Sequence, residues 1–266
     1  GAAPELIARA GLYADRLSTN VELPTEAGLQ SFAPEKKPET IRKTMASVRV
    51  GADDAIEAAK GRLLKKAKPP RFAPAGQSTQ MIIGADASRD DDILATATNL
   101  YSGYHLRRVY YSAYSPIPDA SSDLPPVRPP LMREHRLYQA DWLLRFYGFQ
   151  RAEIMEGASG GMLDLSIDPK LAWALMRRDI FPVDINRAPR ELLLRVPGLG
   201  TRAVDRIVAV RRTGKLRIGD LAKLTASVKK LLPFIHTPDW RPGPLTDSAS
   251  LRARFAPPAE QLSLAL

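Results

Sequence analysis

The segment Pro197-Gly-Leu-Gly200 constrains the fold of this chain more than any other stretch of its sequence. It lies between residues 189–196 and 201–212, two segments with apolar residues at helical spacing. One helix must therefore end and another begin within this short turn. Gly198 and Gly200 are expected to permit positive φ and close approach of another backbone. The sequence predicts two helices joined by a tight turn, with Leu199 entering the core.

The residues on either side of the turn support this prediction. Pro189 suits the first turn of a helix because its missing N–H is not needed there. The first helix then presents one apolar face and the second helix continues it, through Leu192, Leu193, Val196, Val204, Ile207 and Val208.

A turn of this kind points backbone N–H groups outward at the start of a helix, where the helix dipole also favours an anion. We therefore expect a phosphate to bind at Gly198, Leu199, Gly200 and Thr201. Arg202 and Arg206 lie one turn apart and are expected to contact the same or the next phosphate. Contacts of this type position a duplex without specifying its sequence. The alternative is an inter-helix turn that binds no ligand.

The positive charge of the chain is concentrated around this turn. Residues 184–242 contain 13 Lys and Arg against 5 Asp and Glu, a balance of +8, whereas residues 1–183 contain 24 against 22. Such a concentration is typical of a surface that binds a polyanion. From charge alone, a basic face that serves solubility is an equal alternative.

Composition excludes several other classes of site. With 266 residues, 44% of them hydrophobic, the chain is expected to be globular with more than one domain. It has no cysteine, so its residues offer no disulfide or thiolate metal ligand, and the scattered His105, His135 and His236 do not predict a metal site. No apolar run approaches the roughly 18 residues of a membrane span, and the first residues lack a signal pattern. We expect a cytoplasmic protein with no membrane partner.

The first part of the chain alternates helical and extended patterns. Helices are predicted over Pro4–Arg16, Asp53–Lys66 and Asp90–Tyr104, and strands over Leu17–Leu23, Thr79–Gly84 and Arg108–Ser112. This alternation predicts parallel strands joined by helical crossovers. Three strands are few for an independent α/β domain, which suggests part of a barrel.

A proline-rich stretch and two helices connect this part to the basic segment. Ser115–Pro130 contains six prolines and is predicted to be a loop. Leu131–Phe149 and Pro169–Arg178 are predicted helices. The first of them contains Tyr138, Trp142, Phe146 and Tyr147. We interpret these aromatic residues as core, with a base-stacking platform as the alternative.

The hairpin segment resembles the helix-hairpin-helix motif of DNA repair and competence proteins. The resemblance rests on Ile185-Asn186, Leu194–Gly200 and Ile207-Val208. It implies double-stranded DNA as the partner. In the tandem form of this fold a second hairpin follows, but Leu224–Lys230 lacks its Gly-x-Gly. We expect a degenerate second unit in which Lys229 and Lys230 still contact phosphate.

The order of the whole chain is similar to the C-terminal part of bacterial DNA modification or repair radical S-adenosylmethionine proteins. The similar stretches are Ser18–Pro24, Ala75–Gly84, Arg108–Tyr114 and Arg133–Trp142. The resemblance implies an α/β half of a TIM-like radical SAM barrel over residues 1–115, then a proline-rich and helical connector over 116–182. An all-α helix-hairpin-helix domain would follow over 183–240 and a flexible tail over 241–266.

The same resemblance implies cofactor contacts. Asn20 and Glu22 would face the ribose and methionyl group of S-adenosylmethionine, and Met81, Ile82 and Gly84 would line its adenine. Gln80 and Ala87 depart from the family pattern. For Asn20 and Glu22, ordinary polar residues at a strand end are the alternative.

The family holds a 4Fe-4S cluster through a Cys-x₃-Cys-x₂-Cys loop, and this chain has no cysteine. We therefore expect the chain to be catalytically inactive by itself, with its catalytic residues unknown. We interpret it as the C-terminal portion of a longer enzyme. A non-catalytic DNA-tethering protein is the alternative.

The last six residues, Gln261–Leu266, resemble the peptide by which bacterial replication and repair proteins bind the sliding clamp. By that resemblance Gln261 would form a hydrogen bond at the pocket rim while Leu262, Leu264 and Leu266 supply the apolar contacts. The tail from Thr246 is predicted to be flexible. An incidental apolar end is the alternative to a clamp-binding peptide.

Overall fold

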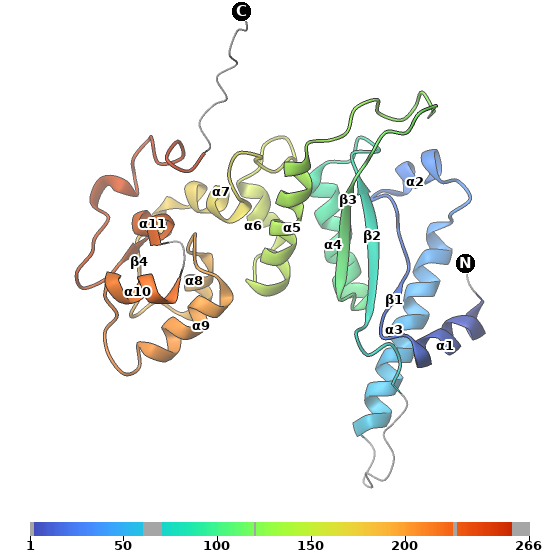
Figure 1. Ribbon diagram of the computed structural model, residues 1–266, viewed down its shortest axis with the longest axis horizontal. Helices are drawn as coiled ribbons and strands as arrows, with labels where there is room; N and C mark the ends of the chain where they lie inside the picture. Colours follow the sequence, from blue (N-terminus) through green and yellow to red (C-terminus); the bar gives the residue numbers. More distant parts are fainter. Residues whose placement is uncertain (1–2, 61–70, 120, 226–227, 257–266) are drawn as a thin grey trace, which may run out of the picture. The chain divides into compact units, whose positions relative to one another are not determined.

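The computed structural model describes residues 3–60, 71–119, 121–225 and 228–256. The chain forms two compact units, Gly1–Leu137 (unit 1) and Tyr138–Leu266 (unit 2). The division falls within helix α5 (Leu131–Phe146), inside the segment predicted to be a connector. The hairpin and most of that connector therefore belong to one unit (Figure 1).

Unit 1 is built on a three-stranded parallel sheet. Strands β1 (Leu17–Ser18), β2 (Gln77–Ile83) and β3 (Arg108–Ala113) lie side by side in the order of the chain. Leu17 pairs with Gln77, and Thr79 pairs with Val109. The predicted parallel pairing of these strands is confirmed. The described strands form no closed barrel, and the half-barrel stays a prediction.

Four helices accompany this sheet: α1 (Pro4–Tyr13), α2 (Glu26–Phe32), α3 (Pro38–Lys60) and α4 (Asp90–Tyr104). Helix α4 matches its predicted span. Helix α3 begins well before its predicted start at Asp53. Met45 and Val48, three residues apart, form the buried face of this earlier part, but the charged residues around them hide the apolar periodicity in the sequence. The sequence prediction missed α2, which begins where Thr25 caps the Gly28 amide.

Alternation along β2 defines the two faces of the sheet. Thr79, Met81 and Ile83 are fully buried, whereas Gln80 and Ile82 are partly exposed, because successive side chains of a strand point to opposite faces. Tyr101 on α4 accepts a hydrogen bond from the Val109 amide at 3.1 Å. This bond ties α4 to β3.

A buried ion pair joins the start of α4 to the start of α5. Arg133 Nε donates to Asp90 Oδ1 at 2.7 Å, and its guanidinium also donates to the Ser88 carbonyl at 2.7 Å. Asp90 is completely buried and Arg133 is 8% exposed. The pair closes the long proline-rich loop, whose Pro129 packs against Gly84.

We predict that Asp90→Asn destabilises unit 1 by about 3–5 kcal/mol, because it leaves the Arg133 charge buried without its partner. Chemical unfolding followed by circular dichroism measures the change. Asp54→Asn, at an exposed position on α3, is the control and should leave the midpoint unchanged. Equal midpoints for both variants would contradict the prediction.

Unit 2 is mainly helical. After α5 come α6 (Arg151–Glu156), α7 (Pro169–Met176), α8 (Arg190–Arg195), α9 (Thr201–Val210), α10 (Ile218–Leu224) and α11 (Val228–Leu231), with 3-10 turns at Arg178–Ile180, Leu232–Phe234 and Gly243–Leu245. Strands β4 (Val183–Asp184) and β5 (Ile235–His236) form a parallel pair.

A chain of aromatic contacts runs through the core of unit 2. Phe149 packs edge-on to Trp173 with ring centroids 5.2 Å apart, and Phe181 lies between Trp173 and Phe234 at 6.4 and 5.1 Å. These residues come from the connector and from the end of the hairpin segment. The hairpin therefore shares its core with the connector.

The aromatic residues of α5 do not all enter a core. Leu137, Ala140 and Leu143 form the buried face of this helix, while Trp142 is 51% and Phe146 is 53% exposed. The interpretation of these two residues as core is wrong, because the smaller apolar residues occupy the other face at the same helical spacing.

The segment after the hairpin packs against unit 2 as far as the structure describes it. Leu251 is fully buried, and Thr246 donates a hydrogen bond to the Pro233 carbonyl at 2.5 Å. The packing of these residues differs from the flexible tail expected from Thr246 onward. Gln261, Leu262, Leu264 and Leu266 lie outside the described residues. Within the described part of the chain, none of the helices has the length and apolar character of a bilayer span.

Candidate nucleic-acid interface

The predicted hairpin is formed by α8, a turn at Val196–Gly200, and α9. The Leu199 amide donates to the Val196 carbonyl at 3.2 Å, and Leu199 is 2% exposed, so it enters the core as expected. Gly198 has φ of +85°, which only glycine adopts without strain. Gly200 has φ of −87° and is the residue before α9, so the expected positive φ at this second glycine is wrong.

Glycine is therefore needed at positions 198 and 200 for different physical reasons. Gly198 supplies the backbone conformation of the turn. Gly200 leaves space at the start of α9, where a side-chain methyl group would have the Tyr147 hydroxyl oxygen as its nearest neighbour, at 3.8 Å. A substitution at Gly198 should therefore distort the turn itself. A substitution at Gly200 should instead block access to the N-terminus of α9.

Hydrogen bonds fix the entry to the hairpin. Asn186 donates its side-chain amide to the Leu216 carbonyl at 3.1 Å and accepts from the Leu216 amide at 2.8 Å. Arg211 donates to the carbonyls of Ile185 and Ala188 at 3.1 and 2.7 Å. These contacts connect the segment before α8 to the segment after α9. The sequence analysis did not assign Arg211 this role.

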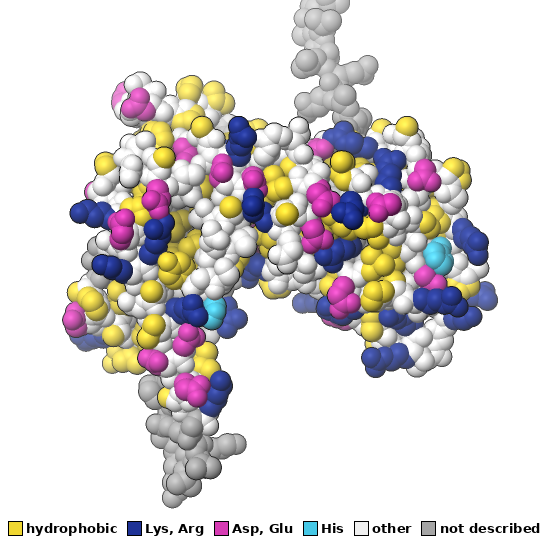
Figure 2. All heavy atoms as spheres, turned by 180° about the vertical axis from the view of Figure 1, so that it is seen from behind, with side chains coloured by type: hydrophobic (Ala, Val, Ile, Leu, Met, Phe, Trp, Pro, Cys, Tyr) yellow, Lys and Arg dark blue, Asp and Glu magenta, His cyan; other side chains and the backbone are white. Residues whose placement is uncertain are grey.

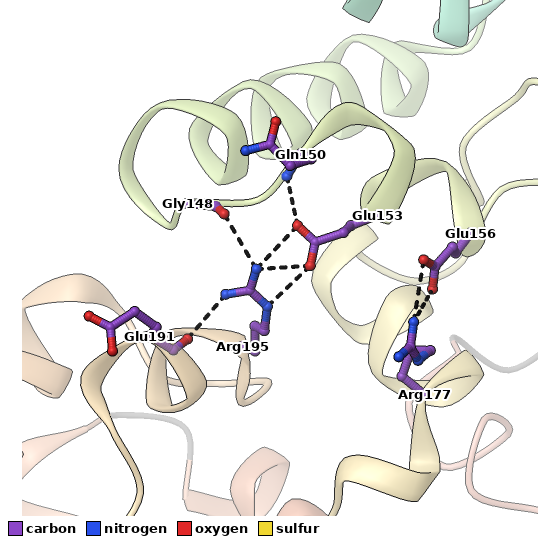
Figure 3. A network of polar contacts seen from close by, with 7 residues as sticks. All are labelled: Gly148, Gln150, Glu153, Glu156, Arg177, Glu191 and Arg195. Carbon is purple, nitrogen blue, oxygen red and sulfur yellow. Dashed lines mark hydrogen bonds and ion pairs between the residues drawn. The ribbon is translucent and has the colours of Figure 1, made fainter.

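Several cations of the basic segment are engaged within the protein. Arg195 forms a bidentate ion pair with Glu153 on α6, at 2.8 and 3.1 Å, and also donates to the carbonyls of Gly148 and Glu191 (Figure 3). Arg190 pairs with Asp205 at 2.9 Å. Lys230 pairs with Asp168, the N-cap of α7. The structure thus places Lys230 against a carboxylate, and its predicted phosphate contact stays a prediction.

The predicted DNA-binding residues of α9 lie at the surface. Arg202 and Arg206 are exposed, and Thr201 is partly exposed. Lys229, on α11, is also exposed. On the face shown in Figure 2, Lys and Arg side chains are frequent over unit 2, with acidic side chains interspersed. Arg202 and Arg206 follow the turn directly, in the position expected for phosphate contacts.

Two residues outside the hairpin meet its turn. Lys170 on α7 is 7% exposed, and its Nζ donates to the Leu199 carbonyl at 2.7 Å. The same Nζ lies 4.6 Å from the centre of the Tyr147 ring. The Tyr147 hydroxyl lies at the start of α9, next to the space beside Gly200. Neither residue was identified from the sequence, because both lie far from the turn along the chain.

Burial shifts the pKa of both groups. The pKa of Lys170 is lowered to about 7, mainly by removal from water and also by the nearby charges of Lys230 and Arg195, while Asp168 acts in the opposite direction. Burial also raises the pKa of Tyr147, with the Asp168 charge adding to it, while the Thr201 hydrogen bond acts in the other direction. Lys170 is thus a buried cation that releases its proton near neutral pH.

We predict that this burial makes the stability of unit 2 depend on pH. Because the folded pKa of Lys170 is depressed, the unfolded state binds more protons above pH 7, and stability rises by up to about 1.4 kcal/mol per pH unit toward pH 9. Lys170→Met should lack this rise. The three tryptophans, Trp142, Trp173 and Trp240, all lie in unit 2, so their fluorescence during urea unfolding reports on it.

The control for this measurement is Lys43→Met, which removes an exposed lysine of α3 in unit 1. It should follow the wild-type pH dependence. Parallel pH profiles for wild type and Lys170→Met would show that Lys170 does not titrate near pH 7.

The residues predicted to contact S-adenosylmethionine lie in unit 1, where Glu22 forms a parallel bridge with Met81 and its carbonyl accepts from the Ile82 amide at 2.6 Å. Asn20 accepts from Ser18 Oγ at 2.9 Å and lines a cavity of about 690 Å³ with Lys36. The backbone of Glu22 is in the left-handed region, with φ of 64°, and its carboxylate forms an ion pair with Lys36 at 2.6 Å. The lining of this cavity includes Asn20 but none of the other four predicted cofactor contacts.

The residues on β2 are also divided between two faces. Met81 is fully buried with Thr79 and Ile83, on the opposite side of the strand from Ile82. Gly84 has φ of +82°, and Pro129 occupies the space that a side chain would need. The predicted adenine contact of these three residues stays a prediction.

The chain also does not fit an iron–sulfur cluster. It contains no cysteine, and the described residues include no group of three or more histidine, aspartate or glutamate side chains placed to hold a metal. These residues therefore do not supply the three thiolate ligands by which the family holds its cluster.

Comparisons with family models, curated proteins and solved structures found no match to the chain.

Proposed function

We propose that unit 2 binds the sugar-phosphate backbone of double-stranded DNA through the α8–α9 hairpin, without sequence preference. The observation that carries the proposal is the turn itself. Gly198 with its positive φ and the buried Leu199 place the N-terminus of α9 at the surface, with Arg202 and Arg206 immediately after it. Backbone amides at such a helix start attract phosphate, and nearby arginines strengthen the contact.

The arrangement of charges supports phosphate contacts over base contacts. Arg190, Arg195 and Lys230 are paired with carboxylates, whereas Arg202 and Arg206, on the helix that follows the turn, are exposed. Backbone amides and arginines at a helix start contact phosphate oxygens, which are the same in every sequence.

This proposal concerns what the residues of this chain can do. In the radical S-adenosylmethionine hypothesis the hairpin holds DNA for a reaction that needs a cluster, and this chain has no cysteine to bind one. The alternative, a non-catalytic DNA-tethering protein, needs unit 1 only as a scaffold. Both hypotheses assign the same role to the hairpin.

We predict micromolar binding to a short duplex with little sequence preference and a steep salt dependence. About three to five phosphate contacts give a slope of roughly −3 to −4 in a plot of log affinity against log salt. Fluorescence anisotropy with two labelled duplexes of unrelated sequence measures both properties. Absence of binding at low salt, or binding that is independent of salt, would contradict the proposed function.

We further predict that Gly200→Val prevents this binding while unit 2 stays folded. The φ of Gly200 suits other residues, and the added side chain would occupy the space before α9. Arg202→Ala should weaken binding by about 1 kcal/mol, or roughly fivefold. Arg9→Ala, an exposed arginine of α1, is the matched control and should bind as wild type.

Circular dichroism and tryptophan fluorescence confirm that each variant is folded before its affinity is compared. If folded Gly200→Val binds duplex DNA normally, the hairpin is a structural turn and the interface lies elsewhere.

A further inference from the structure

Two side chains from outside the hairpin, Tyr147 and Lys170, lie against its turn. Tyr147 follows α5, and its hydroxyl oxygen lies 3.8 Å from the position that a side-chain methyl group at Gly200 would take. Lys170 belongs to α7, and its Nζ donates to the Leu199 carbonyl at 2.7 Å. The Lys170 Nζ also lies 4.6 Å from the Tyr147 ring centre, so the two side chains are in contact.

Lys170 is a buried cation without a carboxylate partner. Its hydrogen bond goes to a neutral carbonyl, and among the described residues no acidic side chain forms an ion pair with it. Asp168, the nearest acidic residue in the sequence, is paired with Lys230, while Glu153 is paired with Arg195. Buried charges are normally compensated by an opposite charge. The turn therefore has a surplus of positive charge beneath it.

The Tyr147 hydroxyl stands where the amides of α9 begin. A phenolic hydroxyl donates a hydrogen bond as well as accepting one, so it can donate to an oxygen placed beside Gly200. The space beside Gly200 is open apart from this hydroxyl. A phosphate oxygen in that space would receive the tyrosine proton in addition to backbone N–H groups.

We propose that Tyr147 and Lys170 complete the phosphate site of the hairpin: the Tyr147 hydroxyl is a direct ligand of a DNA phosphodiester, and the buried Lys170 ammonium supplies its counter-charge. The inference rests on the proposed function and extends it, because it assigns the site to three separate segments. The hairpin provides the amides, the end of α5 provides the hydroxyl, and α7 provides the buried charge.

The first test is Tyr147→Phe, which keeps the ring over Lys170 and removes only the hydroxyl. We expect the affinity for a short duplex to fall about 3- to 10-fold, as for the net loss of one solvent-accessible hydrogen bond. Tyr13→Phe is the control, since Tyr13 is an exposed tyrosine of α1 in unit 1, and its affinity should equal that of wild type.

The second test follows the charge of Lys170 through pH. The groups that face its ammonium are Asp168, Lys230, Arg195 and the Tyr147 ring. A bound phosphate raises the pKa of Lys170 from about 7, so binding takes up a proton above neutral pH and wild-type affinity falls several-fold between pH 6.5 and 8.5. Lys170→Met should bind more weakly at pH 6.5 and show a flat profile, while Lys43→Met keeps the wild-type profile.

The outcomes separate this inference from the proposed function. If wild type does not bind duplex DNA, the proposed function and this inference both fail. If wild type binds and Tyr147→Phe binds equally well, or if the wild-type profile is flat between pH 6.5 and 8.5, the inference alone is overturned. Should Lys170→Met not fold, the Tyr147→Phe affinity and the wild-type pH profile decide the matter.

Discussion

The hydrogen bond from the buried Lys170 Nζ to the Leu199 carbonyl is the interaction on which the architecture of the hairpin turn depends. It links α7 to the middle of the turn over 29 residues of sequence. Both backbone groups of Leu199 form hydrogen bonds: its amide donates to the Val196 carbonyl, and its carbonyl accepts from Lys170 Nζ. A turn fixed in this way has its amides arranged before any ligand arrives, which lowers the entropic cost of binding.

The positive charge of unit 2 has two distinct roles, which a residue count cannot separate. Arg195 and Arg211 are structural: the first joins α8 to α6 through Glu153, and the second ties the hairpin entry to its exit. Arg202 and Arg206 are exposed after the turn. Because paired cations contribute little to the outer field, the attraction for a polyanion depends on the second group.

The sequence predicted the elements whose signals are local. The turn at Gly198, the burial of Leu199, the span of α4 and the parallel strands were predicted because glycine, periodicity and strand-helix alternation act over a few residues. Tyr147 and Lys170 were not predicted, since their contacts with Thr201 and Leu199 exist only after α5, α7 and the hairpin have packed together. Periodicity also could not show which face of α5 is buried, and Trp142 and Phe146 lie on the exposed one.

The two glycines of the turn show how a short motif can combine independent requirements. Gly198 satisfies a backbone requirement, because its φ of +85° excludes most side chains. Gly200 has an ordinary φ, so its small size is what distinguishes it from other residues at that position. An inter-helix turn without a ligand needs only the first of these properties. The open space at Gly200, bordered by the Tyr147 hydroxyl and the start of α9, is what a turn that receives a phosphate requires in addition.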